Sequence, residues 1–362
     1  MKRKSLKLVI TFILFMTASC DEPETVVTDI VHPDGSINRK IEMKNMENKF
    51  KISDIQVPFD TLTWIIRDSL EINDKGDTTW VKRAEKFFKN TGELNQAYKA
   101  DSGNNRNISR RAEFSKTFKW FNTEYRFAEI IEGQSLNGYP VTDFLNQEEM
   151  KWFYSPENVI NDNLDGPDSI KYRALDDTVR KKSDRWILKC LISEWIVSFT
   201  GLTEGKAGDD LTLESLKSRE DDFIKRIELD DEEFDSLWEN GVVLKEFIGE
   251  NNTLKFRTEA DSAVNLATER ILPDFHTYSV RIVLPGKLTG TNGFLDSTGI
   301  MVWPVKSEFF MTQDYKMWAE SKTTNKWAWI VSGLFILFVI SGIVFRQIRN
   351  GTPQSAVPKH DL

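Results

Sequence analysis

The amino-acid sequence predicts an α+β protein, with an antiparallel sheet built from the N- and C-terminal segments and a helical insert between them. Segments near both ends alternate apolar and polar residues with a period of two, whereas the middle repeats apolar residues at spacings of three and four. An uncharged run near the C-terminus adds one predicted transmembrane helix. The alternative arrangement is a β domain and a helical domain in series.

The N-terminal segment predicts two β-hairpins. Thr25–His32 and Ile37–Met43 flank the turn sequence Pro33-Asp34-Gly35-Ser36, in which proline presets φ and glycine tolerates a positive φ. Residues 59–73 and 79–88 are rich in β-branched and aromatic residues and predict the second pair of strands.

An aromatic stretch from Phe114 to Ile131 also alternates with a period of two, but its phase changes between Trp120 and Phe121. A slip of one residue is typical of a β-bulge or a sharp bend. The stretch is compatible with a glycan or lipid groove, although the core of a twisted sheet explains it more simply.

The middle of the chain is predicted to be helical. The strongest pattern lies in Thr178–Phe199, where apolar residues recur on one helical face that includes Cys190. If Cys20 carries a lipid, Cys190 has no disulfide partner within the chain, and we expect it to be a buried structural thiol.

The chain then returns to β structure. In Phe275–Leu284 the even positions form one face, on which His276 is expected to be a buried core imidazole. Thr291-Asn292-Gly293-Phe294 predicts a hairpin turn, and Gly299–Trp303 predicts a short strand that Pro304 ends.

The uncharged run Ala328–Phe345 contains 18 residues. At 1.5 Å per residue it reaches about 27 Å, enough to cross the hydrocarbon core of a bilayer. Trp327 and Trp329 are predicted to lie at one membrane interface, and Arg346 and Arg349 at the other.

The first residues have the features of a secretory signal: a basic segment, the apolar run Leu8–Met16 and small residues before a cysteine. Thr17-Ala18-Ser19-Cys20 resembles the lipobox of bacterial lipoproteins. That resemblance implies cleavage before Cys20 and acylation of its thiol.

Export of the N-terminus combined with one membrane span would place the C-terminus in the cytoplasm. Extracting an apolar helix from a membrane is costly, and Asp21 resembles an inner-membrane retention signal, so we expect an inner-membrane protein facing the periplasm. The predicted parts are a cleaved leader (1–19), a β-rich exported part (20–139), a helical block (140–272), a β-rich return to the membrane (273–326), the transmembrane helix (327–345) and a cytoplasmic tail (346–362).

The returning segment carries a second resemblance. Residues 280–294 read V-R-I-V-L-P-G-K-L-T-G-T-N-G-F, and residues 300–305 read I-M-V-W-P-V before the apolar helix. A strand, Pro-Gly, an asparagine-bearing turn, a strand with tryptophan and an anchor are similar to those of uncharacterised membrane lipoproteins of the LppM type. This resemblance implies no catalytic or ligand-binding residues.

Composition excludes several classes of function. Removal of the leader takes away four positive charges and changes the net charge from −8 to −12, which argues against nucleic-acid binding. Of three histidines, His32 is expected close to the lipid attachment and His360 in the cytoplasm, and only His276 in the interior of the exported domain, so a Cys₂His₂ or histidine-rich metal site is not predicted. No phosphate-binding or dinucleotide motif indicates a cofactor, and no catalytic residue can be named.

The leading functional hypothesis is therefore a non-enzymatic envelope lipoprotein that binds or assembles a protein partner or an envelope lipid. The alternative is a carboxylate-dependent hydrolase of envelope polysaccharide, which requires two acids facing each other across a cleft. A third hypothesis, a lipid carrier, requires an apolar cavity between the sheet and the helical block.

Overall fold

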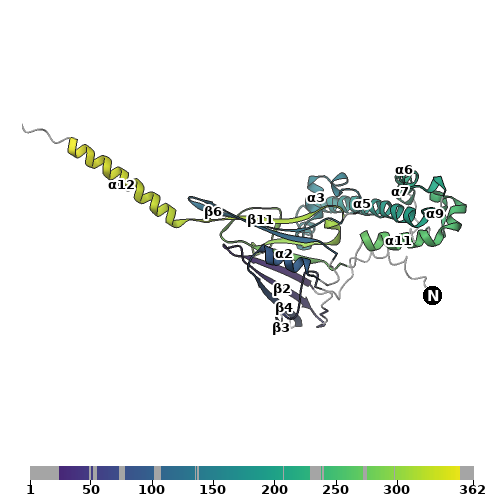
Figure 1. Ribbon diagram of the computed structural model, residues 1–362, viewed down its shortest axis with the longest axis horizontal. Coiled ribbons are helices and arrows are strands. Elements are labelled where there is room, and N and C mark those ends of the chain that lie inside the picture. The colour runs from purple at the N-terminus through teal and green to yellow at the C-terminus, as the bar shows by residue number, and fades with distance from the viewer. Residues whose placement is uncertain are drawn as a thin grey trace, which may run out of the picture.

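The computed structural model describes residues 24–350, apart from 49, 52–54, 73–77, 102–106, 135, 137, 207, 229–237, 239, 272–274 and 297. The leader, Cys20 and the tail beyond residue 350 lie outside the described residues. The α+β class is confirmed: two sheets lie between a long helix, α12, at one end of the molecule and a group of helices at the other (Figure 1).

The first sheet has seven strands in the order β3-β4-β2-β1-β7-β10-β9. It joins N- and C-terminal segments, as predicted, but it is mixed rather than antiparallel, because β1 and β7 pair in parallel with Val27 opposite Val280. A parallel pair needs a long crossover, and the helical block provides it. The strands are β1 Glu24–Val31, β2 Ile37–Asn45, β3 Ile65–Ile72, β4 Thr78–Phe88, β7 Tyr278–Val283, β9 Phe294–Leu295 and β10 Met301–Val305.

The second sheet has four antiparallel strands in the order β5-β6-β11-β8. Its strand β11 runs directly towards α12, and its pairing with β6 is regular over ten positions, from Tyr315 opposite Ile131 to Thr324 opposite Asn122. The strands are β5 Arg110–Lys119, β6 Asn122–Ile131, β8 Lys287–Thr291 and β11 Tyr315–Thr324.

The inner faces of the two sheets form one hydrophobic core. Val27, Ile41 and Val280 from the first sheet lie in the same buried cluster as Phe127 and Met317 from the second. In β1, β2 and β7 buried inward positions alternate with less buried outward positions, as expected for packed sheets, whereas the C-terminal half of β6 is buried on both faces. Helix α2, Thr91–Lys99, contacts both β4 and β5.

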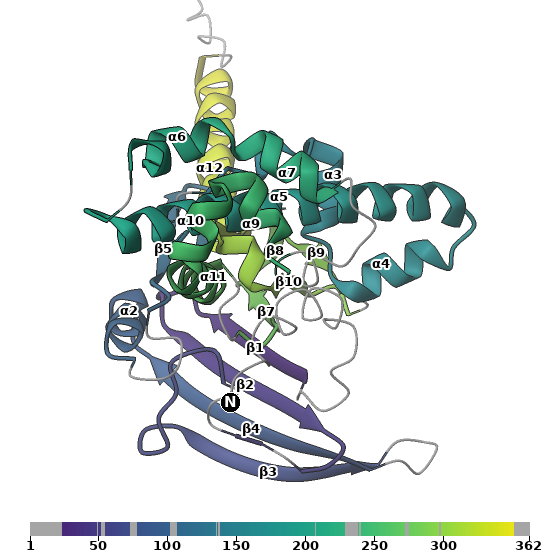
Figure 2. The ribbon, with the colours of Figure 1, turned by 90° about the vertical axis from the view of Figure 1, so that its right-hand side faces the viewer.

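All helices between α2 and α12, except the short η4, fall between β6 and β7 in the chain, and they form a second core around the 35-residue helix α5. Figure 2 shows this helical block above the strands of the first sheet, with α12 behind it. The helices are η2 Val141–Asp143, α3 Gln147–Phe153, α4 Glu157–Leu164, α5 Ser169–Thr203, η3 Asp209–Leu211, α6 Leu213–Ser218, α7 Glu220–Glu228, α9 Val242–Ile248, α10 Glu250–Lys255 and α11 Arg257–Ile271, followed later by η4 Ser307–Phe310 and α12 Lys326–Asn350.

A row of aromatic side chains joins the two cores. Phe153 at the end of α3 packs on Trp186 of α5 and on Phe309 of η4, with ring centroids 6.0 and 5.1 Å apart. Tyr154 stacks on Tyr315 at the start of β11 at 5.4 Å. The helical block is therefore packed against the end of the second sheet that is remote from α12.

The phase change at Trp120–Phe121 is a two-residue hairpin turn and not a bulge, because Lys119 pairs with Asn122 on either side of it. The two halves of the aromatic stretch are thus two strands, β5 and β6, with independent phases.

Three predictions for the returning segment, residues 273–326, were wrong. Thr291-Asn292-Gly293-Phe294 transfers the chain between the sheets, because β8 pairs with β11 whereas β9 pairs with β10. Asn292 bridges them by accepting hydrogen bonds from the Trp303 indole and the Trp318 amide. Strand β10 continues through Pro304. This proline lies beyond the two residues of β10 that pair with β9, so no hydrogen bond to β9 needs its missing N–H. His276 lies before β7 and is half-buried rather than part of the strand face.

Gly286 should be essential where the chain passes from the first sheet to the second. Its φ is +86°, and an added Cβ would clash with the carbonyl oxygen of Lys322 in β11. We expect Gly286→Ala to lower the free energy of unfolding by roughly 1–3 kcal/mol because of backbone strain. Gly201→Ala is the control: it adds a methyl group to open space in α5 and should stabilise by about 1 kcal/mol. Denaturant unfolding of the full chain in detergent tests both, and equal effects would contradict this account.

Candidate functional site

An aromatic collar surrounds the first turns of α12. We use this name for three residues at the tip of the β5–β6 hairpin and two on the helix: Phe118, Trp120, Phe121, Trp327 and Trp329. Trp327 lies 6.3 Å from Phe118 and 5.2 Å from Trp120, and Phe121 lies 4.4 Å from Trp329, all between ring centroids. The five side chains remain 39–58% exposed, so the collar presents aromatic surface outwards.

Asn325 ties the hairpin tip to the start of α12. Its backbone N–H donates to the carbonyl oxygen of Phe121 at 3.0 Å. Its side-chain amide donates to the carbonyl oxygens of Lys119 and Trp120, at 2.8 and 3.2 Å. Its side-chain oxygen accepts a hydrogen bond from the hydroxyl of Thr123 at 3.0 Å. One residue thus satisfies three successive carbonyl groups of the turn.

The hairpin also packs along the side of the helix. The indole N–H of Trp120 donates to the hydroxyl of Ser332 at 2.8 Å. Ser332 lies six residues after Lys326, which is about 9 Å along the helix axis. Ala328, on the turn between them, has no exposed surface. Strand β11, the hairpin and the first turns of α12 therefore form one packed unit.

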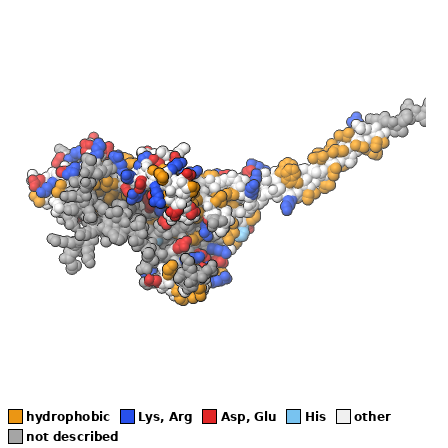
Figure 3. All heavy atoms as spheres, turned by 180° about the vertical axis from the view of Figure 1, so that it is seen from behind, with side chains coloured by type: hydrophobic (Ala, Val, Ile, Leu, Met, Phe, Trp, Pro, Cys, Tyr) orange, Lys and Arg blue, Asp and Glu red, His pale blue; other side chains and the backbone are white. Residues whose placement is uncertain are grey.

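Among the described residues, two helices are long and apolar enough to cross a membrane, namely α5 and α12. The apolar window of α5 is 56% buried and that of α12 is 6% buried. Helix α5 is accordingly the core helix of the helical block, and α12 extends from the folded part with its apolar side chains uncovered (Figure 3).

The structure brings together some of the sequence-predicted interface residues and separates others. Trp327 and Trp329 are both in the collar, whereas Arg346 and Arg349 lie near the other end of α12, at least about 26 Å along the helix. Sequence reasoning missed the hairpin residues and Asn325. Their signal was the phase change at Trp120–Phe121, which a hairpin explains.

A second group of polar residues is sealed between the two sheets. The guanidinium of Arg39 (β2) donates to both carboxylate oxygens of Asp29 (β1), each at 2.7 Å, and to Glu129 (β6) at 2.8 Å. It also donates to the hydroxyl of Tyr98 (α2) at 2.6 Å, and that hydroxyl donates to Glu129 at 2.7 Å. These four residues, which we call the buried quartet, are each at most 8% exposed.

The quartet carries two carboxylates against one guanidinium. Burial, with a smaller contribution from the neighbouring Glu129, raises the pKa of Asp29 to about 6 despite the opposing effect of Arg39. A second cation, Arg110, lies close by, with its guanidinium carbon 6.0 Å from the centre of the Tyr278 ring. Arg110 is 7% exposed, and among the described residues its guanidinium nitrogens have no hydrogen-bond partner.

The arrangement of the quartet is structural rather than catalytic. Its residues come from two sheets and a helix, and mutual hydrogen bonds occupy the carboxylate oxygens that a substrate would need to reach. Removing one partner of such a buried ion cluster leaves an uncompensated charge. The quartet therefore locks the orientation of the two sheets relative to each other.

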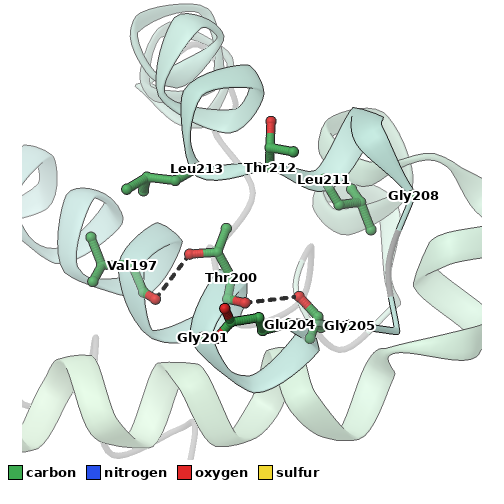
Figure 4. Close-up of a pocket in the computed structure, with 10 residues that line it drawn as sticks. Val197, Thr200, Gly201, Glu204, Gly205, Gly208, Leu211, Thr212 and Leu213 are labelled. Carbon is green, nitrogen blue, oxygen red and sulfur yellow. Dashed lines mark hydrogen bonds between the residues drawn. The ribbon is translucent and has the colours of Figure 1, made fainter.

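A groove of about 430 Å³ lies in the helical block, between the C-terminal part of α5 and the start of α6 (Figure 4). The hydroxyls of Thr200 and Thr203 donate to carbonyl groups of their own helix, so they are not free to orient a ligand. Leu213 is 46% exposed at the rim. Ligand and active sites normally have several polar groups that converge on the bound molecule, and this groove has none among those hydroxyls.

Cys190 is fully buried, as predicted, and burial raises its pKa to about 11. A thiol held in this state is unreactive. Within the part of the chain that the structure describes, no three histidine, cysteine or acidic side chains are grouped so that they could hold a metal ion.

The buried quartet should be far more sensitive to substitution than exposed ion pairs. Arg39→Met should lower the free energy of unfolding by about 3–5 kcal/mol, because two buried carboxylates lose their cation. Arg83→Met is a matched control on the outer face of the same sheet, where Arg83 pairs with Glu42 and Glu71, and it should have only a small effect. Urea unfolding of the full chain in detergent measures both; a small loss for Arg39→Met would refute the structural role of the quartet.

Comparisons with known proteins leave the chain without a family. It matches no protein-family model and no curated protein. Among solved structures, it is similar to the folded domain of the LppM protein of Mycobacterium tuberculosis, over 86% of this chain and 95% of that one, with 8% sequence identity and a TM-score of 0.25. A similarity this weak carries no argument about fold or function, and the collar, the quartet and the groove are interpreted from their own geometry.

Proposed function

We propose that this chain is a membrane-anchored, non-enzymatic binding protein of the cell envelope, which holds its helical block away from the bilayer for a protein partner. The observation that carries the proposal is the collar: it joins α12 to β11 without a flexible linker, at the end of the molecule opposite the helical block (Figure 1). Rigid anchoring at one end gives the other end a defined distance from the membrane.

The chemistry of the described residues favours binding over catalysis. The buried acids Asp29 and Glu129 are clamped by Arg39 and do not face a cleft. The groove beside α5 is lined largely by small, apolar and internally bonded residues, with Glu204 as a charged residue at its edge. Such a groove suits the apolar side chains of a partner protein, particularly next to a basic residue.

The same proposal includes the topology expected from the sequence. Cys20 would carry the lipid, α12 would cross the inner membrane, and the folded part would face the periplasm. Trp327 and Trp329 would then lie at the periplasmic interface, and Arg346 and Arg349 at the cytoplasmic one.

A photo-crosslinking amino acid at Leu213 tests the binding function in intact cells. We expect one discrete protein adduct from Leu213, and none from the more exposed Leu254 on α10, which lies outside the lining of the groove. Because a carboxylate would be desolvated in the interface, Leu213→Asp should abolish co-purification of that protein, whereas Leu254→Asp should not. Co-purification that survives Leu213→Asp, or equal adducts at both positions, would contradict the proposal.

A further inference from the structure

We infer that the tip of the β5–β6 hairpin is itself a membrane-contacting element, which inserts Phe118, Trp120 and Phe121 beside α12 into the interfacial layer of a phospholipid bilayer. The inference rests on the proposed function in one respect, namely that α12 spans a membrane. It adds a second, non-helical point of contact that comes from a segment about 200 residues earlier in the chain.

The hydrogen bond from Trp120 to α12 fixes the depth of the hairpin tip. Ser332, which accepts the hydrogen bond from the Trp120 indole, lies four residues inside the uncharged run that begins at Ala328. The whole run reaches about 27 Å, and without its first four residues it would reach only about 21 Å, too short for a hydrocarbon core of about 30 Å. Ser332 must therefore lie at or below the membrane surface, and the indole bonded to it lies at the same depth.

The backbone of the turn is suited to a low-dielectric environment. Exposed carbonyl groups are costly in a bilayer, because no water is available to bond them. The carbonyl groups of Lys119, Trp120 and Phe121 all accept hydrogen bonds from Asn325, and the indole N–H of Trp120 is bonded to Ser332. A turn that projected into water would not need this arrangement.

The surface around the tip also has the composition of a membrane boundary. The collar side chains are about half exposed, and their aromatic surface continues into the uncovered apolar side chains of α12. Lys119, Lys322 and Lys326 are exposed around the same junction, where Figure 3 shows basic side chains next to apolar surface. Aromatic rings at the interface with lysines that reach the phosphate layer are the usual pattern at a membrane boundary.

Nitroxide accessibility measures the position of the tip directly. The full chain carries a spin label at Phe121→Cys, in nanodiscs made of equal parts of phosphatidylcholine and phosphatidylglycerol. The ratio of collision rates with oxygen and with a water-soluble nickel complex reports depth. Ser115→Cys, on the same strand β5 but five residues before the tip, is the matched control, and Leu337→Cys marks the middle of α12.

We expect the oxygen-to-nickel ratio at position 121 to exceed that at position 115 several-fold, with the highest ratio at 337. Phe118→Cys provides a second label, in case loss of the Phe121 ring disturbs the collar, and should behave like position 121. Asn325→Ala should lower the ratio at 121, because it leaves the carbonyl groups of Lys119 and Trp120 without the side-chain amide that bonds them, whereas Asn252→Ala in the helical block should not.

The outcomes separate this inference from the proposed function. A high ratio at 337 with water-like ratios at both 121 and 118 would refute insertion of the hairpin and leave α12 as the anchor. Water-like ratios at all three positions would refute the membrane anchor itself, and the inference with it.

Discussion

The hydrogen bonds of Asn325 are the constraint on which the architecture depends. They fix the turn between β5 and β6 to the residue that separates β11 from α12. Because β11 is a central strand of the second sheet, the direction of α12 is set by the sheet rather than by a linker. An exposed, uncovered helix usually moves independently of the domain to which it is attached; here the collar removes that freedom.

Two further junctions fix the orientation of the other parts relative to the second sheet. The buried quartet holds the first sheet to the second, with Arg39 at its centre bonded to residues of β1, α2 and β6. The aromatic row around Phe153 and Tyr154 holds the helical block to the far end of the second sheet. Each junction buries groups that would be costly to expose singly, so the three parts behave as one body. This rigidity, more than any single surface, supports the proposed spacing role.

Local sequence patterns predicted where strands and turns occur better than they predicted which strands pair with each other. The alternation of Tyr278, Val280 and Ile282 identified β7, and the Pro-Asp-Gly-Ser sequence identified the turn between β1 and β2. Nothing local distinguishes a strand that pairs in parallel from one that pairs antiparallel, so the β1–β7 pair could not be foreseen. The prediction of a hairpin at Asn292 was wrong for a similar reason, because a hairpin turn and a connection between two sheets use the same types of residue.

The candidate site was predictable only in its helical half. Trp327 and Trp329 stood out because they lie at the start of an uncharged run, which is a local feature. Their partners at the hairpin tip are about 200 residues away in the chain, and a phase change within an aromatic stretch is compatible with a bulge, a bend or a turn. The hydrogen bonds of the quartet could not be predicted for the same reason, since Arg39 and Glu129 are separated by 90 positions in the chain.

The most direct test of the account is the distance distribution between spin labels at Glu113→Cys on β5 and Val339→Cys on α12, measured by double electron–electron resonance with the full chain in nanodiscs. A collar that fixes the helix to the sheet predicts a single narrow distribution, which broadens when Asn325 is replaced by alanine. A broad distribution in the unsubstituted junction, unchanged by Asn325→Ala, would show that α12 is a flexible tether and would contradict the central claim.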